Sequence, residues 1–122
     1  MTKWRIAVLS GLTLSLAVPL VSACSSSTPQ ASAPATASTC QQVSAVLSDG
    51  PDPDADLVGY AEAQILPLRQ ISAPDQTLHA AITQLADAYQ QFFASDGKSS
   101  NAKEAVSVAS NKLNSICPGA AS

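Results

Sequence analysis

The chain has 122 residues, which is enough for one small domain, with 6 basic and 9 acidic side chains. Lys3 and Arg5 lie in an N-terminal segment that we expect to be removed. The four basic and nine acidic residues after Cys24 would then give a net charge of −5. No cluster of Lys or Arg remains, which argues against nucleic acid as a partner and against a polybasic patch for anionic lipid.

Residues 1–23 have the layout of a secretory signal peptide. Two positive charges precede a mostly apolar run over residues 6–21. An uncleaved transmembrane anchor is the alternative, but a spanning helix needs about 20 apolar residues. This run is shorter and contains Pro19, which interrupts a helix. We therefore predict a cleaved leader.

The segment Val21-Ser22-Ala23-Cys24 directly follows the apolar run and resembles the lipobox of bacterial lipoproteins. This resemblance covers the N-terminal signal alone. It implies that the Cys24 thiol receives a diacylglycerol, that a peptidase cuts before Cys24, and that the new amino group is often acylated. Several acyl chains hold a protein firmly, so the resemblance implies a lipid anchor at the extracytoplasmic face of the cell membrane. A cysteine placed by chance in a Ser-rich segment is the alternative.

Residues 25–38, SSSTPQASAPATAS, contain no large apolar side chain and no hydrophobic periodicity. Such a segment cannot bury enough surface to offset its conformational entropy. We therefore predict that residues 24–38 comprise the lipidated cysteine and a disordered linker. Residues 39–122 would form the folded domain.

Apolar residues recur at helical spacing in four segments, and no segment alternates long enough to predict a strand. The first segment is short. Thr39 and Gln42 have capping-box spacing at its start, and residues 49–51 end it. The second begins at Asp52-Pro53, a typical N-cap followed by proline. Pro67 lies inside this second segment and predicts a kink or a break near residues 64–66.

The third and fourth segments predict the longest amphipathic helices. Ser72 and Asp75 have capping-box spacing before the third, which Asp96-Gly97 ends. Its predicted core stripe comprises Leu78, Ile82, Leu85, Tyr89, Phe92 and Phe93. The fourth helix begins around Asn101 and ends at Pro118-Gly119. Its predicted core face comprises Ala102, Ala105, Val106, Ala109, Leu113 and Ile116.

Helices with one apolar face and short connections pack as an antiparallel bundle. The sequence thus predicts an all-α fold, a small antiparallel helical bundle of three long helices plus one short. Lipidation of Cys24 would leave Cys40 and Cys117 at the two ends of the domain. In the oxidising compartment outside the cytoplasm we expect one disulfide between them, which closes the bundle. Two buried free thiols are the alternative.

The sequence favours no catalytic residue and no enzyme activity. G-x-S-x-G, H-E-x-x-H and Gly-rich phosphate motifs are missing from it. The acidic run over residues 52–56 suggests a calcium loop, but Leu57 and Ala63 stand where an EF-hand needs Gly and Glu. These carboxylates suit a helix N-terminus instead, so we predict no metal site and no cofactor.

The sequence therefore favours a non-enzymatic binding or interaction module of the cell envelope, with the membrane and an envelope protein as partners. The chain layout is loosely similar to small mycobacterial and actinobacterial lipoproteins, which implies an envelope location and no activity. A small-ligand carrier for haem or lipid is the alternative. Exported helical haem carriers hold iron through Tyr and His, and the candidates here are Tyr60, His79 and Tyr89. A boundary histidine and an aromatic core stripe are the simpler interpretations.

Overall fold

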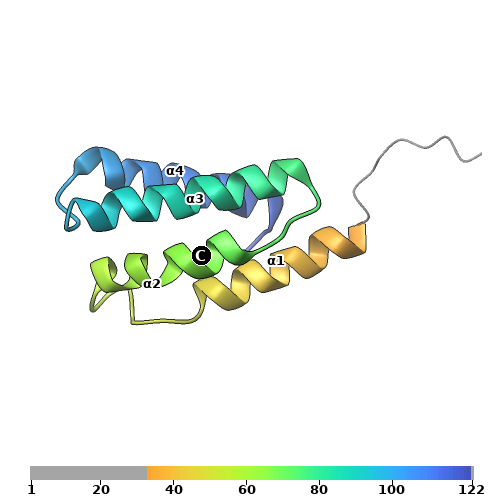
Figure 1. Cartoon of the computed structure of the whole chain (residues 1–122), viewed down its shortest axis with the longest axis horizontal. Coiled ribbons are helices and arrows are strands. Elements are labelled where there is room, and N and C mark those ends of the chain that lie inside the picture. Colours follow the sequence, from red (N-terminus) through yellow and green to blue (C-terminus); the bar gives the residue numbers. More distant parts are fainter. Residues whose placement is uncertain (1–32, 122) are drawn as a thin grey trace, which may run out of the picture.

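The computed structural model describes residues 33–121, which form four α-helices. These are α1 (Ala33–Leu47), α2 (Leu57–Gln70), α3 (Gln76–Ala94) and α4 (Ser100–Ile116). Each helix runs opposite to the one before it, so the helices form an antiparallel bundle (Figure 1). The predicted all-α class is confirmed. The predicted leader and Cys24 lie outside the described residues.

Helix α1 begins at Ala33 rather than at Thr39, so residues 33–38 are helical where a disordered linker was predicted. Thr39 is no cap. It is buried inside the helix, and its Oγ1 donates a hydrogen bond to the carbonyl of Ala35 at 3.0 Å. Alanine is a strong helix former, and Pro34 is tolerated because it lies in the first turn. With 15 residues, α1 is longer than the 14 of α2, so the prediction of one short helix at this place is wrong.

Helix α2 begins at Leu57 with Asp56 as its N-cap, not at Asp52-Pro53. The Asp56 carboxylate accepts a hydrogen bond from the Gly59 N–H at 2.9 Å. Asp52 instead accepts from the backbone N–H of Asp54, within an isolated turn before the helix. Pro67 does not break α2, which continues to Gln70. The lost backbone bond is tolerated where buried neighbours, Ile65 and Leu68, hold the helix against the core.

Helices α3 and α4 each begin with a side-chain cap. Asp75 accepts from the Leu78 N–H at 2.7 Å, and Ser99 accepts from the Ala102 N–H at 3.2 Å. Ser72 therefore plays no capping part. The predicted end of α3 is confirmed, because Asp96 and Gly97 both adopt positive φ values, +51° and +67°, just beyond it.

The core is built around α3, which packs against both α2 and α4. The largest fully buried apolar side chains of the core are Val43, Leu68, Leu78, Ile82, Leu85 and Leu113. Tyr89 and Phe92 are also buried, but Phe93 is 38% exposed, so its predicted place in the core is wrong. Adjacent residues on a helix point about 100° apart, and Phe92 takes the inward position.

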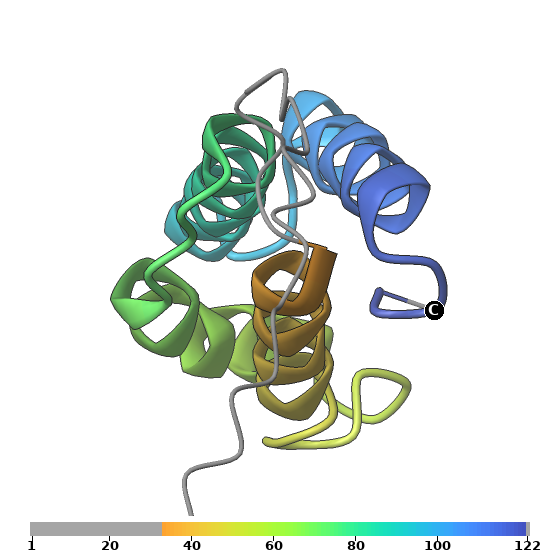
Figure 2. The same cartoon turned by 90° about the vertical axis from the view of Figure 1, so that its right-hand side faces the viewer.

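Cys40 and Cys117 form a disulfide, with their Cα atoms 5.4 Å apart, which confirms the predicted pairing. The bond joins the middle of α1 to the residue that follows α4. Helix α1 packs less extensively than the other helices and buries Thr39 and Val43 fully. Seen end-on, α1 lies beside the C-terminal residues (Figure 2). None of the helices in the described range combines the length and apolarity of a membrane span.

Candidate functional site

The structure brings together two of the three predicted ligand residues, Tyr60 on α2 and Tyr89 on α3. Their rings meet edge to face, with centroids 5.9 Å apart and an interplanar angle of 85°. The Tyr60 hydroxyl donates a hydrogen bond to the carbonyl of Leu47, at the end of α1, at 2.7 Å. The pair thus lies where the end of α1 and the first turn of α2 meet the second half of α3.

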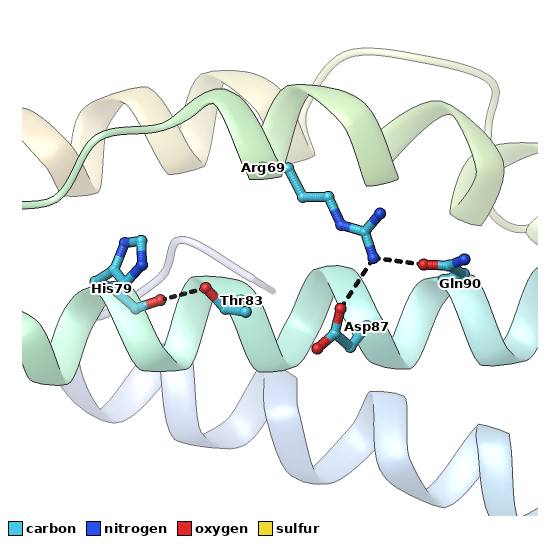
Figure 3. A network of polar contacts seen from close by, with 5 residues as sticks. All are labelled: Arg69, His79, Thr83, Asp87 and Gln90. Atoms are coloured by element: carbon cyan, nitrogen blue, oxygen red, sulfur yellow. Dashed lines mark hydrogen bonds and ion pairs between the residues drawn. The ribbon is translucent and has the colours of Figure 1, made fainter.

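His79 does not belong to this site. It is exposed on α3 and precedes Tyr89 by ten residues, about 15 Å along the helix. Its backbone carbonyl accepts a hydrogen bond from Thr83, and it lies on the part of α3 that faces α2 (Figure 3). The structure therefore brings Tyr60 and Tyr89 together but does not bring His79 to them.

Burial raises the pKa of Tyr89 far above its ordinary value, and the neighbouring Tyr60 adds to the rise. Burial also raises the pKa of Tyr60. Both hydroxyls are therefore neutral at physiological pH. Iron prefers a tyrosine in its phenolate form, so this environment and the distant His79 do not fit haem ligation by these side chains.

Two adjoining surface hollows lie next to the tyrosine pair. The first, of about 220 Å³, is almost entirely apolar and is lined by Leu57, Tyr89, Phe92, Lys103 and Val106. The second, of about 320 Å³, is lined by Leu47, Ser48, Pro53, Leu57, Tyr60, Tyr89 and residues 119–121. Because Leu57 and Tyr89 line both, we treat them as one surface, the tyrosine groove. Together the two hollows reach the size of small-molecule sites in proteins.

The groove is open because of how the α1–α2 connection folds. Residues 48–56 contain no large apolar side chain that could cover the start of α2. Leu57 is consequently 47% exposed, although it lies at helical spacing from the buried Ala61 and Leu68. Whether Leu57 is covered depends on the side chains of residues 48–56, and helical periodicity within α2 does not reveal this.

The C-terminal turn (residues 118–121) forms one end of the groove and was missed by the sequence prediction, which treated Pro118-Gly119 only as a helix end. The Ala121 N–H donates to Oδ1 of Asn114 at 2.8 Å, and Asn114 Nδ2 donates to the Ala121 carbonyl at 3.1 Å. Ala120 is buried. The sequence signal for this turn was the pair of alanines, Ala120 and Ala121, directly after Pro118-Gly119.

Lys103, in the first part of α4, is the one charged residue that lines either hollow. The ion pairs of the described residues are Arg69 with Asp87, at 3.0 Å, and Lys98 with Asp96, at 2.7 Å. Lys103 thus belongs to no ion pair within residues 33–121. The groove combines apolar surface with one unpaired positive charge.

Two other polar clusters have structural explanations. Arg69 of α2 donates to both Asp87 and Gln90 of α3, which ties these helices together at an exposed position (Figure 3). In the α1–α2 connection, Asp52 and Asp56 accept backbone hydrogen bonds. Across residues 33–121, no three His, Cys, Asp or Glu side chains are grouped as metal ligands.

Gln64 is a buried polar residue of α2. Its Nε2 donates to the Asp49 carbonyl at 2.6 Å, whereas its Oε1 has no hydrogen-bond partner among the described residues. The side chain borders a small hollow of about 130 Å³ and connects α2 to the loop after α1.

Comparisons with protein families, with curated proteins and with solved structures found no match for this chain.

Proposed function

We propose that the protein is an exported lipoprotein, anchored through Cys24 at the extracytoplasmic face of the cell membrane. The Cys40–Cys117 disulfide supports this proposal, because structural disulfides persist mainly in oxidising compartments. It also accounts for two of the three cysteines, so Cys24 in its lipobox-like context is the one left for lipidation. Cys24 itself lies outside the described residues.

At the membrane, the bundle acts as a non-enzymatic binding module. The tyrosine groove is the observation that carries this role. Its surface is apolar around Tyr89 and Phe92 and has a single cation, Lys103. Burial keeps both tyrosines protonated, so neither is poised as a nucleophile or a base. Such a surface suits holding a partner better than breaking a bond.

Anchoring is tested by Cys24→Ala, with Ser25→Ala as the neighbouring control. The wild type and the control should stay with membranes, and the Cys24→Ala protein should leave them. Intact-mass measurement of the membrane form should show a chain that begins at Cys24 and carries diacylglycerol. An unmodified residue 24 behind an intact leader contradicts the proposal.

Binding is tested by a photo-crosslinking amino acid placed at Leu57 or, as control, at Leu66. Both are exposed leucines of α2, 47% and 67% exposed, but only Leu57 lines the groove. In intact cells we expect a reproducible adduct from position 57 and none from position 66. Equal adducts, or none at either position, would argue against a groove-centred binding module.

A small-ligand carrier is the second candidate function. The volume of the tyrosine groove and the apolar lining of its first hollow favour it. The neutral tyrosines and the remote His79 favour an apolar chain over haem as its ligand. Titration with haem should therefore give no shift of the Soret band in the native protein.

A further inference from the structure

We propose that the tyrosine groove binds one long-chain fatty acid, with the acyl chain along its apolar surface and the carboxylate at Lys103. This inference deepens the proposed binding role and is independent of whether Cys24 is lipidated. The proposed ligand is thus an amphiphile with a single acyl chain and one negative charge. The shape, the polarity and the charge of the groove support this proposal.

The shape of the groove fits one chain. Lys103 and Val106 lie near the start of α4, whereas the C-terminal turn, just beyond the other end of α4, lines the second hollow. The turn folds back onto Asn114, and residues 103–114 of a helix span about 16 Å. One leaflet of a bilayer, whose chains are of this kind, is about 15 Å thick. The groove is therefore long enough for a single extended chain.

The polarity of the first hollow fits a hydrocarbon. The first hollow is lined by the side chains of Leu57, Tyr89, Phe92 and Val106, with little polar surface. Leu57 is exposed here although it is a large apolar residue. An acyl chain laid against it would remove this apolar surface from water, which is the main driving force for such binding. A polar ligand would gain little from these side chains.

The charge at the groove fits a monoanion. Lys103 belongs to no ion pair within the described residues, and its four methylenes can lie along the apolar surface while the ammonium stays in water. A carboxylate at the groove edge would pair with it. The residues after Cys24 carry a net charge of −5, which disfavours ligands with several negative charges. A fatty acid meets both conditions.

The experiment uses isolated membranes that carry the membrane form of the protein, together with a palmitic acid analogue that has a diazirine in its chain. After illumination and digestion, mass spectrometry locates the label. We expect it on peptides that contain residues 57–60, 89–92 or 103–106. Excess palmitic acid should prevent labelling, and hexadecanol, which has the same chain without the charge, should compete about three- to fivefold less well.

Matched variants separate charge from general effects. Lys103→Gln should lower labelling about three- to fivefold and remove the preference for the acid over the alcohol, whereas Lys112→Gln, also on α4 but outside the groove, should change neither. Leu57→Ser should lower labelling, and Leu66→Ser should not. An intact Cys40–Cys117 disulfide in each variant verifies folding.

Three outcomes would overturn the inference: no label on the groove peptides, equal competition by acid and alcohol, or equal behaviour of the two lysine variants. These outcomes are distinct from failure of the proposed function. A crosslink from position 57 to an envelope protein, without fatty acid labelling, would retain the binding module and reject its lipid ligand. The Cys24→Ala protein, labelled in solution after its release from membranes, should keep the same labelled groove peptides.

Discussion

Asn114 holds the backbone of Ala121 through two hydrogen bonds, one to the N–H and one to the carbonyl, at 2.8 and 3.1 Å. This pairing folds the C-terminal turn back against the bundle, where Ala120 becomes buried. Residues 119–121 then line the second hollow beside Tyr60 and Tyr89. One amide side chain thus shapes an end of the candidate site.

Asn114→Ala should release the C-terminal turn. Loss of the two hydrogen bonds should lower the free energy of unfolding by about 1–2 kcal/mol, measured by urea denaturation. Backbone amides of residues 120 and 121 should exchange with solvent faster. Asn111→Ala, at an exposed site on the same helix, is the control and should have little effect. Equal effects of the two substitutions would contradict the role given to Asn114.

Removal of the disulfide should loosen α1 before the other helices. For a bridge with a sequence separation of 77 residues, the chain-entropy model gives about 4–5 kcal/mol of stabilisation. The double variant Cys40→Ala with Cys117→Ala should lose stability of this order. Hydrogen exchange should show the largest change in α1, because it packs less extensively than α2, α3 and α4.

The native protein should also have a mass lower by two hydrogen atoms than after reduction. A reductant should destabilise the wild type and leave the double alanine variant unchanged. A uniform rise in exchange over all four helices would indicate that α1 is not the weakly held element.

The tyrosine pair predicts a loss of stability in alkali. The pKa values of Tyr60 and Tyr89 are raised above the ordinary 10.0. The folded state therefore keeps both protons at a pH where the unfolded chain loses them. The contribution of the two tyrosines to the free energy of unfolding should be constant below about pH 10 and fall as the pH rises from there through the folded-state pKa values.

The measurement is a titration of phenolate absorbance, to which only these residues contribute because the chain has 2 tyrosines. The native protein should titrate above the urea-unfolded protein, and Tyr60→Phe and Tyr89→Phe should assign the two steps. Coincident native and unfolded titrations would show that the pair is not buried as described.

Gly97 and Gly119 allow backbone strain to be separated from steric clash. Both have positive φ, +67° and +80°. A Cβ at Gly97 would lie 3.0 Å from Val58 and 3.1 Å from Phe92, whereas none of the described atoms would lie within 4 Å of a Cβ at Gly119. Gly119→Ala should cost about 1 kcal/mol, and Gly97→Ala distinctly more. Thermal unfolding ranks the two, and a reversed order would contradict the packing around Gly97.

Features that arise within one segment could be read from the sequence. The stripe of α3 follows from helical spacing, and the ends at Asp96-Gly97 and Pro118-Gly119 follow from the backbone preferences of glycine and proline. The Cys40–Cys117 pairing followed from the number and positions of the cysteines. Each depends on local geometry or covalent chemistry, so no knowledge of neighbouring helices was needed.

Features that depend on distant segments could not be read in this way. Asp52 and Asp56 both have the chemistry of an N-cap, and the packing of α2 against the bundle selects Asp56. Phe93 continues the apolar stripe, yet it remains outside the core because α2 and α4 leave room for Phe92 instead. The tyrosine groove has the same origin. Its residues come from separate helices and a terminal turn, and the energy that places them is the burial of surface between segments far apart in the chain.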